Sequence, residues 1–131
     1  MIRFLLDTNV VIGAGKANRR ILARLQQYGE LQCTISTITV HELYFGAFKS
    51  DLVSENLKAA KNIPFDIVDF DENDAVVASE VRDSLRRLGT PIGPYDTLIA
   101  GQALVRDLTL VTRNTREFER VEGLRVEDWE G

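Results

Sequence analysis

The sequence is poor in the residues that build several common kinds of site. It contains one cysteine, one histidine and one tryptophan among 131 residues. A single cysteine cannot form an internal disulfide, which favours a reducing, cytoplasmic location. One cysteine and one histidine are also too few ligands for a structural zinc site. A serine-hydrolase triad would depend on His41 alone as its base, and no nucleophile elbow accompanies it.

Long apolar runs are missing as well. No stretch approaches the roughly 20 apolar residues that a membrane-spanning helix needs, so we expect no membrane association. Only Phe4, Leu5 and Leu6 precede Asp7 as an apolar run, so no secretory signal is expected. The chain also lacks repeats, low-complexity tracts and Gly/Ser linkers. Its length suits one domain, and we therefore predict a single domain over residues 1–131.

Two segments resemble functional motifs but lack required residues. His41-Glu42 is similar to the start of a zinc-protease helix, but that motif needs a histidine at position 45, which is Phe45. Residues 13–16, Gly-Ala-Gly-Lys, lack the spacing and the Ser or Thr of a phosphate-binding loop. We therefore interpret His41 as an ordinary helix residue and expect no nucleotide-binding loop.

Apolar patterns of strand length alternate with helical patterns along the chain. Strands are expected at Ile2–Leu6, Gln32–Ile35, Phe65–Phe70, Leu108–Thr112 and Leu124–Val126. Helices are expected at Ala17–Tyr28, from a cap at Ser36 or Thr37 to Lys49, and at Ser54–Lys61, Asp71–Leu88, Pro94–Arg106 and Thr115–Arg120. Such alternation predicts an α/β fold with a parallel sheet covered by helices. Ligands of such sheets bind beyond the carboxyl ends of the strands, where Asp7 and Asn114 are expected.

Three carboxylates lie where a metal-dependent nuclease would need them. Asp7 ends the first strand, Glu42 lies within a helix that is apolar nearly all round, and Asp96 opens a helix. Taken singly, Asp7 is explained as a helix cap, Asp96 as a charge that offsets the helix dipole, and Glu42 as an exposed glutamate. An all-round apolar helix predicts burial on more than one side, however, and a buried glutamate needs a partner. Together the three predict an oxygen-ligand site for a hard divalent cation.

Residues after the fourth predicted strand add further candidates. Asn114 is explained either as a helix cap or as a fourth ligand that holds a water. Glu117, one helical turn further on, supplies the charge that Asn114 lacks, or belongs to a surface ion pair. Arg113, Arg116 and Arg120 recur at spacings that would form one helical stripe. The stripe is either a solvated face laced with glutamates or a surface that guides RNA phosphates, although the net charge of −4 argues mildly against a nucleic-acid partner.

Four segments, in order, resemble the PIN-domain family. They are Phe4-Leu5-Leu6-Asp7-Thr8-Asn9, Thr39-Val40-His41-Glu42-Leu43, Gly93-Pro94-Tyr95-Asp96-Thr97-Leu98-Ile99-Ala100 and Leu110-Val111-Thr112-Arg113-Asn114-Thr115-Arg116-Glu117-Phe118. The similarity extends over almost the whole chain, and the Gly-Pro-Tyr-Asp segment makes it specific. Within the family the pattern is similar to that of VapC-type toxins of bacterial toxin–antitoxin pairs.

The resemblance implies a three-layer α/β/α PIN-like fold with a central, mostly parallel sheet. It also implies an endoribonuclease that depends on Mg²⁺, with Mn²⁺ as a possible substitute. The catalytic and metal-binding acidic positions of the family carry over onto Asp7, Glu42 and Asp96. The fourth acidic position matches Asn114, so either Glu117 compensates or Asn114 holds a water. Thr112 matches a polar residue that lines the site of the family.

The resemblance further implies a VapB-like antitoxin that wraps the toxin and blocks its site, often with a basic side chain. It implies homodimers, toxin–antitoxin hetero-oligomers and promoter DNA bound only through the antitoxin. The expected substrate is structured RNA, especially transfer RNA. Two alternatives stay open: a non-catalytic PIN-like binding module and a non-toxin RNA-processing nuclease. A phosphoryl enzyme of the haloacid dehalogenase type is disfavoured, because it needs an aspartate where Asn9 stands.

Overall fold

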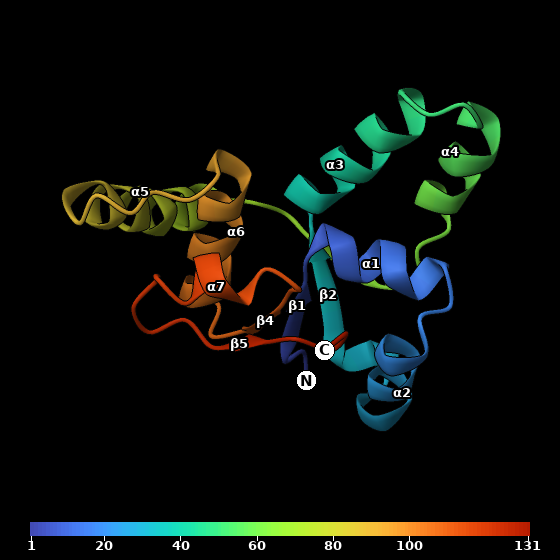
Figure 1. Ribbon diagram of the computed structural model, residues 1–131, viewed down its shortest axis with the longest axis horizontal. Coiled ribbons are helices and arrows are strands. Elements are labelled where there is room, and N and C mark those ends of the chain that lie inside the picture. The colour runs from blue at the N-terminus through green and yellow to red at the C-terminus, as the bar shows by residue number, and fades with distance from the viewer.

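In the computed structural model, which describes all 131 residues, a five-stranded sheet runs between two layers of helices (Figure 1). The strands are β1 (Phe4–Leu6), β2 (Cys33–Ser36), β3 (Asp66–Val68), β4 (Thr109–Val111) and β5 (Val126–Glu127). Their order across the sheet is β3-β2-β1-β4-β5, and every neighbouring pair is parallel. The predicted three-layer α/β architecture is confirmed, with a sheet that is wholly rather than mostly parallel.

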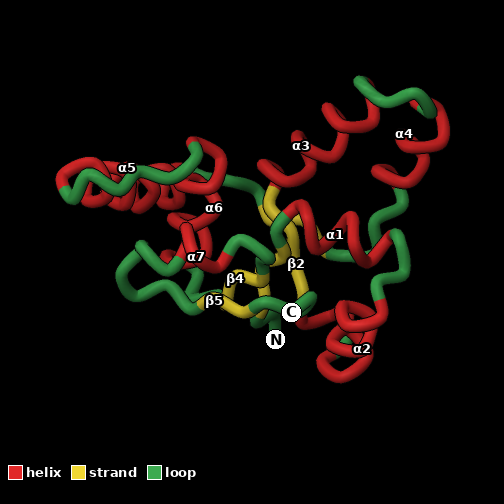
Figure 2. The backbone as a smooth tube through the Cα atoms, viewed as in Figure 1, coloured by secondary structure: helices red, strands yellow, loops and turns green.

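Helices connect the strands and cover both faces of the sheet (Figure 2). They are α1 (Thr8–Gly15), α2 (Arg19–Tyr28), α3 (Thr37–Phe48), α4 (Val53–Lys61), α5 (Glu72–Arg87), α6 (Pro94–Val105) and α7 (Thr115–Phe118), with a 3-10 turn at Glu30–Gln32. Figure 1 shows α5, α6 and α7 on one side of the sheet and α1 to α4 on the other. Not one of these helices has the length and apolar character needed to cross a bilayer.

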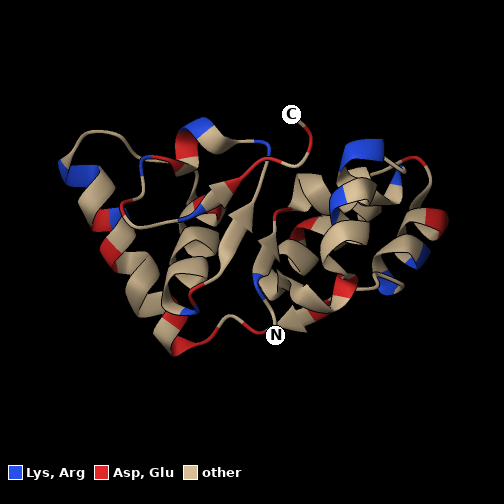
Figure 3. Cartoon of the chain, turned by 90° about the horizontal axis from the view of Figure 1, so that it is seen from below, with Lys and Arg blue, Asp and Glu red and all other residues tan.

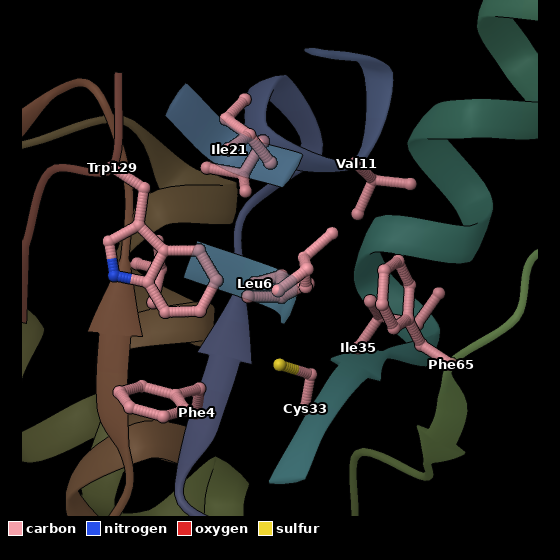
Figure 4. Close-up of a cluster of buried hydrophobic side chains, with 11 residues drawn as sticks. Phe4, Leu6, Val11, Ile21, Cys33, Ile35, Phe65 and Trp129 are labelled. Carbon is pink, nitrogen blue, oxygen red and sulfur yellow. The ribbon is translucent and has the colours of Figure 1, made fainter. Parts of the chain in front are cut away.

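The alternation of side chains along β1 divides the core in two. Phe4 and Leu6 point to the side of α1 and α2, where they pack with Ile21 and Trp129 (Figure 4). Leu5 points to the opposite side and packs with residues of α5, α6 and α7. Successive side chains of a strand point to opposite faces, so a strand buried on both faces is apolar at every position. β1 is therefore the centre of the fold, and its carboxyl end has a fixed position.

The first helix, α1, was not predicted. The first predicted helix begins at Ala17, whereas α1 already occupies Thr8–Gly15. Two glycines and an asparagine lower the helix propensity of this segment, but Val10 and Val11 are buried and tertiary packing outweighs propensity. Ala17 instead lies in the turn between α1 and α2, with a φ of 59°.

The other predicted helices and strands are present, with shifted ends. Ser36 is the cap of α3, since its Oγ accepts a hydrogen bond from the backbone N–H of Ile38 at 3.0 Å. The strand predicted at Phe65–Phe70 is shortened to β3, and the one predicted at Leu124–Val126 overlaps β5 only at Val126. These strands lie at the two edges of the sheet, where pairing on one side only gives the sequence pattern less control over strand length.

Helices α5 and α6 are locked together by a buried charge and a close backbone contact. Asp74 of α5 is fully buried, and its carboxylate accepts hydrogen bonds from Arg106 Nε at 3.1 Å, Arg106 Nη2 at 3.0 Å and Gln102 Nε2 at 3.2 Å. A Cβ atom on Gly101 would lie 2.5 Å from the backbone of Ala78, so only glycine permits this approach of the helices. The lock fixes α6, the helix that carries Asp96, against α5.

We predict that Arg106→Ala destabilises the protein by about 3 kcal/mol, because Asp74 then remains buried without its cation. The matched control is Arg86→Ala, which removes an exposed ion pair to Asp83 and is expected to change stability very little. Urea unfolding of both variants measures the difference. Equal losses of stability in the two variants would contradict the importance of the buried pair.

Candidate active site

Asp7 lies at the carboxyl end of β1 and is held by both neighbouring segments. Its backbone N–H continues the sheet by donating to the carbonyl of Val111 at 2.9 Å. Its Oδ1 accepts from the backbone N–H of Thr8 at 2.8 Å, so that Asp7 is the N-cap of α1, and its Oδ2 accepts from Thr112 Oγ1 at 2.8 Å. The side chain is only 7% exposed. The cap role considered for Asp7 is real, and it leaves the carboxylate fixed in one orientation.

Thr112 links Asp7 to the start of the following turn. Its buried hydroxyl donates to Asp7 and accepts from the backbone N–H of Asn114 at 3.0 Å. Asn114 is the N-cap residue of α7, as one of its two interpretations predicted, but its side chain makes no capping hydrogen bond. The amide of Asn114 therefore stays free for a water or a ligand at the end of β4.

Glu42 reaches the residue next to Asp7 from α3, in the layer of helices α1 to α4. It is half-buried on α3, and its Oε1 accepts a hydrogen bond from Thr8 Oγ1 at 3.1 Å. Burial raises the pKa of the Glu42 carboxyl, the Thr8 hydrogen bond opposes that rise, and the charge of Asp7 adds to it. No part in the site was predicted for Thr8. The signal that pointed to its role was its place directly after Asp7 at the carboxyl end of a central strand.

Asp96 completes the cluster from the first turn of α6. Burial, and after it the negative charges of Asp7, Glu117 and Glu42 in that order, raise the pKa of its carboxyl to about 6. Carboxylates affect one another in this way only at short range. The structure thus places Asp7, Glu42 and Glu117, from three other segments of the chain, near enough to Asp96 for their charges to act on it, at the carboxyl edge of the sheet where a site was expected.

Basic residues flank this edge but do not form the predicted stripe. Only Arg116 lies within α7, because the helix begins after Arg113 and ends before Arg120. Arg120 is used structurally, donating to the carbonyl of Pro91 at 3.1 Å. Arg113 and Arg116 are exposed, as on a solvated face, and form no ion pair. Figure 3 shows basic and acidic residues interspersed along the chain.

The helix that carries Glu42 is less buried than its composition predicts. Phe45 is 59% exposed and Phe48 is 62% exposed on α3, so burial on more than one side is wrong for the isolated chain. Glu42 owes its partial burial to the neighbouring α1, through Thr8, and not to an enclosing core. Apolar side chains in excess of what the core needs indicate that α3 contacts other molecules.

The donor set fits a hard divalent cation. All four carboxylates lack an ion-pair partner, so their negative charge is uncompensated within the chain. No three of them converge closely enough to hold one ion in common. That spacing suits Mg²⁺, which keeps several waters and takes only one or two protein carboxylates. Asp7 is buried and Asp96 is half-buried, and each follows or opens an element with a fixed position.

A family model described as "PIN domain" matches residues 4–124. The chain belongs to the PIN-domain family. It is 40% identical to the tRNA(fMet)-specific endonuclease VapC of Shigella flexneri, over 98% of this chain and 99% of that protein. Among solved structures, it is similar to a chain of the DNA-bound VapBC from Salmonella typhimurium, with 40% identity, a TM-score of 0.92 and coverage of 98% and 99%. It is also similar to VapBC2 from Rickettsia felis bound to a promoter DNA fragment, with 31% identity, a TM-score of 0.89 and coverage of 98% and 99%.

The raised pKa of Asp96 predicts that this PIN domain is destabilised by its own site when no metal is bound. A carboxyl with a folded pKa of about 6, above its ordinary 3.8, favours folding fully below the ordinary value and loses that contribution as pH rises through 6. We expect Asp96→Asn to raise stability in EDTA at about pH 7.5. The gain is about 1 kcal/mol, after reduction for solvent exposure and for the lost interaction with the N-terminus of α6.

Thermal unfolding of the wild type and Asp96→Asn across pH tests this prediction. The gain in stability should shrink as pH falls toward 4, because Asp96 is then protonated in the folded chain. An asparagine variant that is less stable than the wild type at neutral pH would show that burial and the neighbouring charges do not destabilise the Asp96 carboxylate.

Proposed function

We propose that this chain is the toxin of a toxin–antitoxin pair and acts as a divalent-metal-dependent endoribonuclease. The observation that carries the proposal is the set of four uncompensated carboxylates at the carboxyl edge of a parallel sheet, in a chain 40% identical to a tRNA-specific endonuclease over nearly its full length. That relative supports transfer RNA as the substrate class. We place the reaction in the cytoplasm, because the cytoplasm contains RNA and keeps a free thiol such as that of Cys33 reduced.

The residues divide the work of phosphodiester hydrolysis. Asp7 and Asp96 would hold Mg²⁺, or Mn²⁺ in its place. When bound, such an ion supplies an acidified water and neutralises charge on the phosphate. Thr112 keeps Asp7 in its orientation, and Thr8 does the same for Glu42. Glu42, whose pKa burial raises, is suited to orient the attacking water and accept its proton.

The remaining residues of the site adjust its negative charge, hold a water or contact the RNA. Glu117 supports the fourth acidic position in place of Asn114, because its charge acts directly on Asp96. Asn114 is left to hold a water through its free amide. Arg113 and Arg116, exposed and without ion pairs, supply positive charge for the phosphates on either side of the cut.

We predict that the purified chain cuts transfer RNA in the presence of Mg²⁺ or Mn²⁺ and that EDTA stops the cleavage. Asp7→Asn and Asp96→Asn should each lower the cleavage rate by roughly 100-fold or more, because each removes a direct metal ligand. Both variants should keep a folded far-UV spectrum. Cleavage that persists equally in wild type and variants indicates a contaminating nuclease. Metal binding without cleavage of any RNA indicates a binding module instead.

The antitoxin is proposed to occupy an apolar groove beside the site. This groove, of about 670 Å³, lies between α1, α2, α3 and α4 and is lined mainly by apolar side chains, among them Leu22, Leu25, Leu43, Ala47, Ile63 and Phe65. Glu42 also lines it, so the groove leads into the carboxylate cluster. An antitoxin segment with apolar side chains for the groove and one basic side chain for Glu42 would cover both. The VapBC complexes similar to this chain support such a partner.

Gly46 offers a sharp test of the groove. It lies on α3 in the groove wall, and a Cβ atom there would meet nothing within 4 Å, so a larger side chain enters the groove and not the core. Gly46→Phe is expected to weaken neutralisation by the antitoxin encoded beside the gene by roughly tenfold or more. RNA cleavage should be unchanged.

The matched control is Gly46→Ala, which should keep neutralisation and stabilise α3 by about 0.5–1 kcal/mol. Titration of cleavage with purified antitoxin measures both variants. Full neutralisation of Gly46→Phe would place the antitoxin elsewhere on the chain.

A further inference from the structure

Two aromatic rings meet at the rim of the carboxylate cluster. His41 of α3 and Tyr95 of α6 have ring centroids 5.6 Å apart, with their planes at 48°. Each ring belongs to the residue directly before a carboxylate of the site, His41 before Glu42 and Tyr95 before Asp96. Neighbouring side chains on a helix point about 100° apart, so the rings lie beside the carboxylates and not among them.

Neither ring is needed to hold the fold together. Tyr95 is 46% exposed and His41 is exposed, and both are absent from the two buried hydrophobic clusters. The hydroxyl of Tyr95 and the nitrogens of His41 make no hydrogen bond within the chain, whereas a structural tyrosine or histidine usually finds a polar partner. An exposed aromatic pair at the mouth of a site is instead typical of a binding surface.

We propose that the His41–Tyr95 pair stacks an unpaired nucleobase of the RNA next to the scissile phosphate. This inference rests on the proposed nuclease function and specifies its substrate as RNA with a base free to leave its stack. A site that fixes a phosphate necessarily holds the two flanking nucleosides beside it. Proteins read single-stranded and looped RNA by stacking such bases on aromatic side chains.

The charges around the pair favour a base over other parts of the RNA. The adjacent cluster is acidic, so a phosphate is repelled at the rim, whereas a neutral base is not. The tilt of 48° lets a base lie parallel to one ring and meet the other at its edge, a favourable arrangement for aromatic groups. A base in this place sits against α3 on one side and α6 on the other, which orients the sugar and phosphate toward Asp96.

The test compares Tyr95→Ala and Tyr95→Phe with the wild type in cleavage of a short RNA hairpin cut in its loop. Tyr95→Ala should lower kcat/KM by roughly 5- to 150-fold, the range expected for one base–aromatic stack. Tyr95→Phe should stay within about threefold of the wild type, because stacking uses the ring and not the hydroxyl. Both variants should unfold at nearly the wild-type temperature, since the ring is exposed.

An RNA with an abasic nucleotide beside the cut completes a double-mutant cycle. At one of the two flanking positions, removing the base should cost the wild type a factor similar to that of Tyr95→Ala. The two losses should not multiply, because they remove the same contact. Independent, multiplying losses at both positions would overturn the proposal, as would equal damage by Tyr95→Phe and Tyr95→Ala. Wild-type cleavage by Tyr95→Ala, with weakened antitoxin binding or a dissociated dimer, would assign the rings to a protein partner.

A second measurement separates this proposal from the nuclease function itself. The same hairpin with 2-aminopurine beside the cut is bound to Asp96→Asn and to the double variant Tyr95→Ala, Asp96→Asn. Stacking changes the fluorescence of 2-aminopurine, so the first protein should quench it and the second should not. If no RNA is cut by the wild type but this difference is present, the proposed function fails and the stacking surface stands. No difference between the two proteins overturns the stacking surface.

Discussion

The structure depends on a repulsion that the chain does not relieve by itself. Four carboxylates lie at the carboxyl edge of the sheet without an ion-pair partner, and burial together with the neighbouring negative charges raises the pKa of Asp96 to about 6. Such an arrangement would spread apart if the elements beneath it were soft. It persists because Asp7 directly follows a strand that is buried on both faces, and because both of its carboxylate oxygens accept hydrogen bonds. The fixed position of β1 is therefore what keeps the charged side chains of the site close to one another.

The second support is remote from the site. Asp96 stands at the N-terminal end of α6, and the opposite end of that helix carries Gln102 and Arg106, which bind the buried carboxylate of Asp74. Gly101 brings α5 and α6 into backbone contact between these two ends. These contacts hold α6 firmly against α5. The position of Asp96 relative to Asp7 is therefore supported by the attachment of α6 to α5 and by the packing of α6 against β1.

The sequence was informative wherever a residue's place follows from chain topology. Parallel strands end at one edge, so Asp7 and Asn114 were expected there, and the helix start at Asp96 followed from Pro94. It was uninformative where long-range packing decides. Helix α1 forms despite poor propensity because Val10 and Val11 fill the core, and no local pattern shows that. The bond from Thr8 to Glu42 joins residues 34 positions apart.

The predicted burial of α3 was also wrong because of long-range contacts. An all-round apolar helix was taken as a helix buried within the domain, but Phe45 and Phe48 are exposed. The apolar residues of a helix include those that face the core and those that are buried only when a partner binds. The excess of apolar residues on α3 was therefore a signal of association, misread as a signal of the core.

Glu42 joins the two functions proposed for this chain into one electrostatic system. It belongs to the carboxylate cluster through Thr8 and Asp7, and it also lines the apolar groove between α1, α2, α3 and α4. A basic side chain brought by a partner in the groove would satisfy part of the charge that a metal ion otherwise satisfies. The partner's basic side chain and the metal ion would then neutralise the same negative charge. Binding of either one would lower the affinity of the site for the other. Inhibition of such a site requires no conformational change, because neutralising the cluster removes the attraction for the metal ion on which cleavage depends.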